Sequence, residues 1–333
     1  MFKLIEEHVN FKSGNHYLAG TLTMPELQGM RPVCPGAVLI HGSGAFCRDA
    51  VCFPHRPFKV IAEHLAYRGI SVLRYDKRGV RESEGTMEGI TSFDLADDAA
   101  AAVDYLRHHQ YIKKDRIGLI GQSEGGLIAS IVAAKNKALA FAVMLAAPAI
   151  LGHQVLLDQT ETFARAAGED EDTIARKLEE SKEIFATIRD EPDEVVLRGK
   201  LFQLMARFDY DSEENNSRDA KVKSMSSPWF RTFLGLEASK YVSQISCPVL
   251  AMCGTKDTQV LAEPNIAAIE EALVSGSPRS TAVMLPGFNH MLQQCETGLP
   301  WEYPHLPEAI SPFVVDLTAD WIWSLFAVPD NLN

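Results

Sequence analysis

The sequence has little positive charge and no long hydrophobic run. Of its 333 residues, 44 are Asp or Glu and 32 are Lys or Arg, so the formal net charge is −12. Nucleic-acid phosphates are bound by clustered Lys and Arg, and here the basic residues are scattered among acids. We therefore expect no nucleic-acid partner. No apolar run approaches the roughly 20 residues that cross a bilayer, so no membrane span is predicted.

Cysteines are few and scattered. The chain has six of them and no CxxC pair, which is not a disulfide framework for this length. We expect structural thiols, with no metal ion and no organic cofactor. The first residues, Met1–Glu7, lack the uninterrupted apolar core of a secretory signal. A cytoplasmic location is therefore predicted, although a chain from which a signal had been removed would look the same.

Short apolar runs alternate with segments of helical length. A β-hairpin is predicted at 8–12 and 17–24, followed by strand-like runs at 37–40, 71–75, 116–120, 141–146, 248–253 and 281–285. Helices are predicted at 58–68, 92–109, 124–134, 264–274 and 312–326. This alternation is typical of βαβ units, and so predicts an α/β fold with a mostly parallel sheet and helices on both faces.

One segment, from 152 to 235, breaks the alternation and turns charged. Its apolar residues recur at helical spacing, as at Ile174, Leu178, Phe185 and Ile188. A second helix is predicted at 194–208. We interpret 152–235 as a helical cap or lid over the carboxyl ends of the strands, inserted into a core made of 1–151 and 236–333. Its aromatic residues, Trp229, Phe230 and Phe233, are expected to anchor the insert more than to line a cavity.

A G-x-S-x-G pentapeptide at 121–125 marks Ser123 as a nucleophile. The motif follows the apolar run 117–120 and precedes a helix of small apolar residues, which is the strand–turn–helix context that it requires. Glycine suits both ends of so tight a turn, and the helix N-terminus adds free N–H groups. The alternative is a Gly/Ser turn without chemistry, and the context favours the nucleophile.

A serine hydroxyl needs an adjacent base, which an acid in turn orients. In this topology the expected chain order is Ser, Asp, His. Asp257 follows the run 248–253 and His290 follows the run 281–285, so both lie where strand ends meet at one edge of the sheet. Three alternatives are weaker because none comes just after a strand: Glu263, Asp316 and His305.

The loop His41-Gly42-Ser43-Gly44 follows the first parallel strand and is the candidate oxyanion loop. A tetrahedral intermediate needs two N–H donors aimed at its negative oxygen. We expect these to be the backbone amides of Ser43 and Glu124. His41 is interpreted as a residue that orders the loop, not as a second base.

Together these motifs resemble the α/β-hydrolase superfamily. The likeness is closest to its bacterial esterase and dienelactone-hydrolase-like branch, which is related to the catalytic domains of prolyl-oligopeptidase-type peptidases. Further matching segments are Arg48-Asp49, Arg74-Tyr75-Asp76-Lys77-Arg78-Gly79, Gly254-Thr255-Lys256-Asp257 and Gly287-Phe288-Asn289-His290. The resemblance implies a triad of Ser123, Asp257 and His290, oxyanion amides from Ser43 and Glu124, and loops braced by Arg48, Asp49 and Asp76. Arg81 stands where relatives often carry a glycine.

The expected activity is cleavage of small carboxylic esters through an acyl-enzyme intermediate. A peptidase or amidase acting on short peptides, a thioesterase and a carbohydrate deacetylase would use the same groups, so these alternatives stay open. A non-catalytic binding protein on a hydrolase fold is a further alternative. The expected partner is a small-molecule ester or short peptide, and a homodimer stays open as an oligomeric state.

Overall fold

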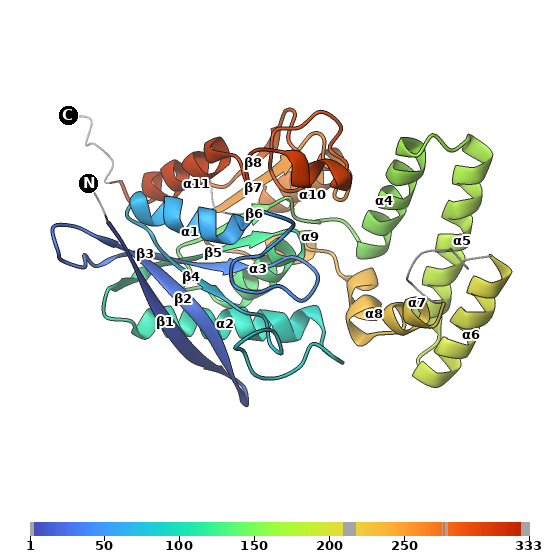
Figure 1. Cartoon of the computed structure of the whole chain (residues 1–333), viewed down its shortest axis with the longest axis horizontal. Coiled ribbons are helices and arrows are strands. Elements are labelled where there is room, and N and C mark those ends of the chain that lie inside the picture. Colours follow the sequence, from blue (N-terminus) through green and yellow to red (C-terminus); the bar gives the residue numbers. More distant parts are fainter. Residues whose placement is uncertain (1–2, 209–217, 275, 277–278, 328–333) are drawn as a thin grey trace.

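A single eight-stranded sheet forms the centre of the molecule (Figure 1). The computed structural model describes residues 3–208, 218–274, 276 and 279–327. The strands are β1 (Lys3–Ser13), β2 (His16–Glu26), β3 (Cys34–Ile40), β4 (Ser71–Tyr75), β5 (Ile112–Gln122), β6 (Phe141–Leu145), β7 (Val249–Gly254) and β8 (Thr281–Leu285). Their order in the sheet is β1-β2-β4-β3-β5-β6-β7-β8.

The sheet is parallel from β4 to β8 and antiparallel at the N-terminal hairpin. β1 pairs with β2, and β2 pairs antiparallel with β4. The strands β3, β4, β6 and β7 are buried along their whole length, because helices cover both faces of the sheet. The predicted α/β architecture, a mostly parallel sheet with helices on both faces, is confirmed.

Five helices of the core correspond to the five predicted ones. On one face lie α1 (Pro57–Tyr67) and α11 (Pro312–Ser324), and on the other lie α2 (Ser92–His108), α3 (Glu124–Lys135) and α10 (Ala262–Leu273). The short helices α9 (Ser239–Val242) and η1 (Pro300–His305) complete the core. Within the described ranges, no helix is both long and apolar enough to cross a membrane.

The charged segment between β6 and β7 folds into helices that stand beside the core, at the right of Figure 1. They are α4 (Gly152–Ala166), α5 (Glu171–Asp190), α6 (Glu194–Arg207), α7 (Arg218–Met225) and α8 (Pro228–Gly235). Their own apolar cluster includes Ile184, Ile188, Leu201 and Val222. We call these helices the cap. That 152–235 is a separate domain stays a prediction, although α4 begins at Gly152 and α8 ends at Gly235.

Arg81 has an unusual backbone conformation. Its φ of +51° lies in the left-handed region, which residues other than glycine rarely adopt. The position after Arg78-Gly79-Val80 therefore suits glycine for a conformational reason, and the chain keeps the turn with arginine there.

Candidate active site

Ser123 occupies a strained turn between β5 and α3. Its φ of +56° and ψ of −128° are rare for a residue with a side chain. The Ser123 amide donates to the carbonyl of Leu145 on β6 at 2.8 Å, which holds the turn against the sheet. The strand ends at Gln122 and the helix begins at Glu124, so the turn is as short as the motif predicts.

The two motif glycines are required by backbone contacts. A Cβ atom on Gly121 would lie 2.0 Å from the carbonyl oxygen of Gly125, and one on Gly125 would lie 2.0 Å from that of Ile40. Both distances are far inside van der Waals contact, and backbone atoms cannot turn away as a side chain could. The turn therefore packs directly against the end of β3, from which the candidate oxyanion loop starts.

We expect Gly125→Ala to lower the free energy of unfolding by about 3 kcal/mol or more, because the new methyl group would overlap the Ile40 carbonyl. The matched control is Gly199→Ala in α6, where no atom lies within 4 Å of the added Cβ. There alanine should stabilise the helix by about 0.5–1 kcal/mol. Urea unfolding of both variants measures the contrast, and equal midpoints would contradict the packing argument.

The structure brings His290 and Asp257 into direct contact. His290 Nδ1 lies 2.7 Å from Asp257 Oδ2, and both side chains are buried. Asp257 Oδ1 accepts the amides of Gln259 and Val260 at 2.8 and 2.9 Å, which fixes the carboxylate. With Nδ1 donating to the carboxylate, the other ring nitrogen of His290 is the one left to accept a proton.

Ser123 and His290 line the same cavity, whose volume is about 390 Å³, together with Gly42, Ser43 and Glu124. Ser123 Oγ makes no hydrogen bond within the described part of the chain, so it does not bond to His290 here. Contacts between a nucleophile and its base often tighten only when substrate is bound. Four of the five residues expected from sequence thus line one pocket, and the fifth, Asp257, lies outside the lining in contact with His290.

The three alternative residues lie elsewhere. Glu263 is exposed at the start of α10, and His305 is exposed at the end of η1. Asp316 on α11 is bonded to the side chains of His64 and Arg68, at 2.8 and 2.6 Å. None of the three lines the cavity over Ser123.

The candidate oxyanion amides are free to bind a ligand. Neither the Ser43 nor the Glu124 amide donates a hydrogen bond to another described residue, and as the first residue of α3 the latter has no acceptor within the helix. His41 is fully buried, bonds the carbonyl of Cys47 and stacks on Phe58 at 4.5 Å. Burial, and secondarily the charge of Lys77, lowers the pKa of His41 to about 3, so its ring is a neutral loop-ordering group.

Sequence reasoning missed two buried charged side chains beside the nucleophile. The Glu124 carboxylate, 1% exposed, accepts Ser43 Oγ at 2.9 Å, Ser92 Oγ at 2.6 Å and Trp229 Nε1 at 2.7 Å. Lys77 Nζ donates to the carbonyl of Gly42 at 2.6 Å, and burial lowers the pKa of Lys77 to about 8. The available signals were a carboxylate inside the G-x-S-x-G motif and a lysine shortly after β4.

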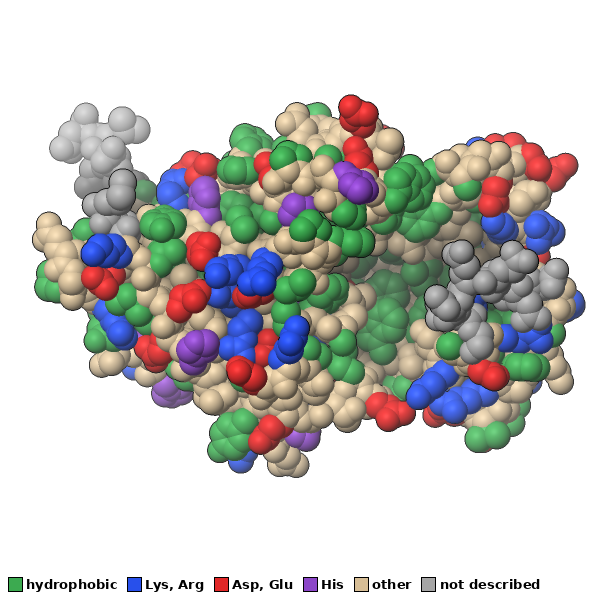
Figure 2. All heavy atoms as spheres, in the orientation of Figure 1, with side chains coloured by type: hydrophobic (Ala, Val, Ile, Leu, Met, Phe, Trp, Pro, Cys, Tyr) green, Lys and Arg blue, Asp and Glu red, His purple; other side chains and the backbone are tan. Residues whose placement is uncertain are grey.

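The cavity wall above Ser123 is apolar and comes partly from the cap. Apolar side chains gather in the hollow between core and cap (Figure 2). Trp229 and Phe233 line the cavity and stack with ring centroids 5.6 Å apart. Because the Trp229 indole also bonds Glu124 of the core, this residue both anchors the insert and lines the cavity. Phe230 instead packs within the cap against Phe185. Because α8 begins at Pro228, one helical turn places positions 229 and 233 on the same side.

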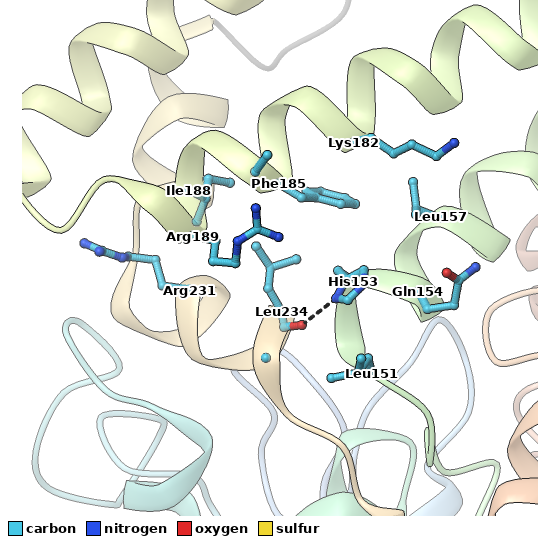
Figure 3. A pocket seen from close by; sticks show the side chains of 12 residues that line it. Leu151, His153, Gln154, Leu157, Lys182, Phe185, Ile188, Arg189, Arg231 and Leu234 are labelled. Carbon is cyan, nitrogen blue, oxygen red and sulfur yellow. Dashed lines mark hydrogen bonds between the residues drawn. The ribbon is translucent and has the colours of Figure 1, made fainter.

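A second cavity, of about 630 Å³, lies inside the cap between α4, α5 and α8 (Figure 3). The His153 ring, bonded to the carbonyl of Leu234, lines it together with Phe185 and Arg189 from α5. No residue of the candidate triad lines it. The cavity over Ser123 is therefore the candidate active site.

Glu302 clamps a loop at the edge of the active-site cavity. Its carboxylate accepts the amides of Glu296, Thr297 and Gly298 and the hydroxyl of Thr297. Partial burial acts to raise the pKa of Glu302, but these hydrogen bonds outweigh it and lower the pKa to about 2. The neighbouring Pro300 and Tyr303 line the cavity, so the clamp supports its wall.

Because the folded-state pKa of Glu302 lies below its ordinary value of 4.5, its stabilisation is present above pH 4.5 and is lost as the pH falls towards 2. At pH 6 we expect the urea midpoint of unfolding to be higher for the parent than for Glu302→Gln. This difference in midpoint should shrink as the pH falls below 4.5. Glu296→Gln, on the same loop but exposed, is the control. A difference that is constant from pH 6 to pH 3 would contradict the clamp.

The chain is similar to known hydrolases. A family model described as serine aminopeptidase, S33, matches residues 55–297. Esterase EstD of Thermotoga maritima is 26% identical over 309 residues, which are 92% of this chain and 65% of EstD. Carboxymethylenebutenolidase of Pseudomonas putida is 27% identical over 137 residues, 40% of this chain and 58% of that enzyme. The chain thus spans less than two thirds of either relative.

Solved structures support the fold. An esterase from Pyrococcus furiosus superposes with a TM-score of 0.58 at 17% identity, covering 98% of this chain and 92% of that one. The α/β hydrolase GrgF from Penicillium superposes with a TM-score of 0.57 at 19% identity, covering 97% and 100%. The predicted membership of the α/β-hydrolase superfamily is confirmed.

Proposed function

The chain belongs to the serine aminopeptidase S33 family of α/β hydrolases, and from that premise we propose that it is a carboxylesterase acting on small acyl esters. Ser123 is the proposed nucleophile, His290 the general base, Asp257 the acid that orients it, and the amides of Ser43 and Glu124 the oxyanion donors. The cap, residues 152–235, is proposed as a lid that completes the substrate pocket.

The character of the pocket carries the proposal. Its walls are mainly apolar, with side chains such as Phe46, Val155, Phe233 and Met291, and its volume of about 390 Å³ suits a short acyl group. Among the described residues that line it, Glu124 is the one carboxylate, and that group already accepts three hydrogen bonds. An uncharged substrate therefore suits this pocket better than a charged one.

This observation also favours ester cleavage over aminopeptidase action. An aminopeptidase must hold the α-ammonium group of its substrate, and a buried ammonium needs a carboxylate or several acceptors of its own. The Glu124 carboxylate is committed to Ser43, Ser92 and Trp229. The similarity to an esterase over 92% of this chain supports the same choice.

The proposed mechanism is two-step acyl transfer. As Ser123 Oγ attacks the ester carbonyl carbon, His290 takes the hydroxyl proton, and the carbonyl oxygen becomes an oxyanion bound by the two amides. The C–O bond to the alcohol then breaks as His290 returns the proton to that oxygen. Water, deprotonated by the same imidazole, attacks the acyl-enzyme carbonyl, and the acyl C–Oγ bond breaks as His290 returns the proton to Ser123 Oγ, which releases the acid. Asp257 stabilises the imidazolium in both steps through the 2.7 Å contact.

A substrate panel tests the proposal. The chain is assayed with p-nitrophenyl esters of two to eight carbons, with butyryl thioester and acetylated sugar substrates, and with Pro- and Ala-p-nitroanilide. We expect the highest kcat/KM with a short p-nitrophenyl ester and a value at least about 100-fold lower with the anilides. Preference for either aminoacyl anilide would overturn the esterase assignment in favour of an aminopeptidase.

A further inference from the structure

A hydrogen-bonded link joins the cap to the candidate oxyanion loop. It starts at Trp229 on α8, whose indole N–H donates to the Glu124 carboxylate at 2.7 Å. The other oxygen of that carboxylate accepts the hydroxyl of Ser43 at 2.9 Å. The Glu124 carboxylate itself is buried, while Ser43 is exposed and Trp229 is half-buried. Hydrogen bonds to an ionised carboxylate are stronger than those between neutral groups.

The peptide unit between Gly42 and Ser43 is held from the side opposite the pocket. Its carbonyl oxygen accepts Lys77 Nζ at 2.6 Å, and Lys77 is 3% exposed. In a trans peptide the carbonyl and the following N–H point in opposite directions, so fixing the oxygen fixes the Ser43 N–H as well. Lys77 thus sets the direction in which the Ser43 N–H points, while the Ser43–Glu124 bond fixes the position of the loop relative to α3.

Glu124 and Trp229 stand between two cavities. One is the cavity over Ser123, and the other, of about 800 Å³, is lined by Gly44, Lys77, Met87 and cap residues including Pro228. Glu124 and Trp229 line both. With open space on each side, the loop depends for its position on the specific bonds that reach it, and not on close packing alone.

On these contacts, and resting on the function proposed above, we propose that Trp229 is a positioning residue through which the cap holds the oxyanion loop in its active geometry. When the cap is in place, Trp229 orients Glu124, Glu124 orients Ser43, and the Ser43 amide points at the reacting carbonyl oxygen. When the cap moves away, the Trp229–Glu124 hydrogen bond breaks and the Ser43 amide is held less firmly in its active orientation. The cap thereby couples substrate enclosure to transition-state stabilisation.

The other described polar contact between cap and core near this loop is much weaker. Lys223 on α7 lies 3.7 Å from Glu88, with the two side chains 70% and 82% exposed. Exposed ion pairs contribute little, since water competes for both charges. The Trp229–Glu124 bond is therefore the contact whose loss should be felt at the loop.

Trp229→Phe is the test, because it keeps an aromatic ring and removes the N–H. Loss of a whole oxyanion donor lowers kcat by about 100- to 1,000-fold, so a loosened donor should lower it by about 10-fold. We expect that fall in kcat for p-nitrophenyl butyrate, with KM within about 2-fold of the parent. The matched control is Trp323→Phe on α11, far from the cavity. It removes an indole N–H that donates to the carbonyl of Arg68, and this variant should keep the parental kcat.

A double-mutant cycle with Ser43→Ala separates the link from a merely structural role. Ser43→Ala removes the hydroxyl at the other end and keeps the amide, so alone it should also lower kcat about 10-fold. Because both changes break one link, the double variant should be no more than about 2-fold worse than either single one. A roughly 100-fold loss in the double variant, or a change confined to KM in Trp229→Phe, would overturn the proposal.

The rate of Ser123 labelling by a fluorophosphonate probe gives a second readout that needs no ester substrate. If the parent labels but hydrolyses no ester, the proposed substrate class is wrong while the link is still tested by the labelling rates. A labelling rate in Trp229→Phe equal to that of the parent would then overturn the link. Labelling slowed about 10-fold in each single variant, and no more than about 2-fold further in the double variant, would support it.

Discussion

Ser123→Ala is expected to lower kcat for p-nitrophenyl butyrate by at least about 10⁴-fold, because water would have to attack the ester without a covalent intermediate. The proposed base and oxyanion amides stay in place, so KM should change by no more than about 3-fold. The variant should also fail to react with a fluorophosphonate probe. Steady-state kinetics and intact mass after labelling measure both effects.

The matched control for this variant is Ser130→Ala. Ser130 is buried on the same helix, α3, and its hydroxyl donates to the carbonyl of Leu127 within that helix. It does not line the cavity over Ser123, so its kcat should be that of the parent. Activity in Ser123→Ala close to the Ser130→Ala level would show that another group performs the chemistry.

Asp257→Asn is expected to lower kcat by about 10³- to 10⁴-fold at neutral pH. Two backbone amides, of Gln259 and Val260, hold one side-chain oxygen, so the Asn amide nitrogen would be turned towards His290 Nδ1. That nitrogen donates, which would leave Nδ1 as the acceptor and place the ring proton on the nitrogen that must accept from Ser123. The size of the loss therefore reports the tautomer of His290 and not a change of shape.

The chain contains a closely matched control for this second prediction. Asp316 Oδ1 lies 2.8 Å from His64 Nε2, so it forms the same kind of pair on the surface, far from the cavity. Asp316→Asn should leave kcat unchanged and alter stability only slightly. A comparable loss of kcat in both variants would contradict a specific role for Asp257.

The residues expected from sequence share one physical property: their positions follow from local chemistry and sheet topology. The turn at Ser123 needs glycine at 121 and 125 within five consecutive residues, so the sequence itself carries the signal. Asp257 and His290 were expected because each follows a parallel strand, and parallel strands end at a common edge. The observed β7 and β8 place them there, 2.7 Å apart.

The cap illustrates where such reasoning stops. The stripe that includes Ile174 and Ile188 predicts α5, and the structure buries both residues on that helix. No periodicity tells which face of α8 meets the core, because that depends on how five helices pack around their own apolar cluster. Trp229 and Phe233 were therefore expected to anchor the insert, and the structure shows that they also line the cavity.

Sequence alone determined the α/β fold, the turn at Ser123 and the places of Asp257 and His290 at strand ends, because helix periodicity, glycine sterics and strand order act over short stretches or obey simple topological rules. Only the tertiary structure decided the roles of the Glu124 carboxylate, of Lys77 and of Trp229. Their hydrogen bonds join residues 32 to 105 positions apart, and whether a buried charge finds its partner depends on the packing of every element between them.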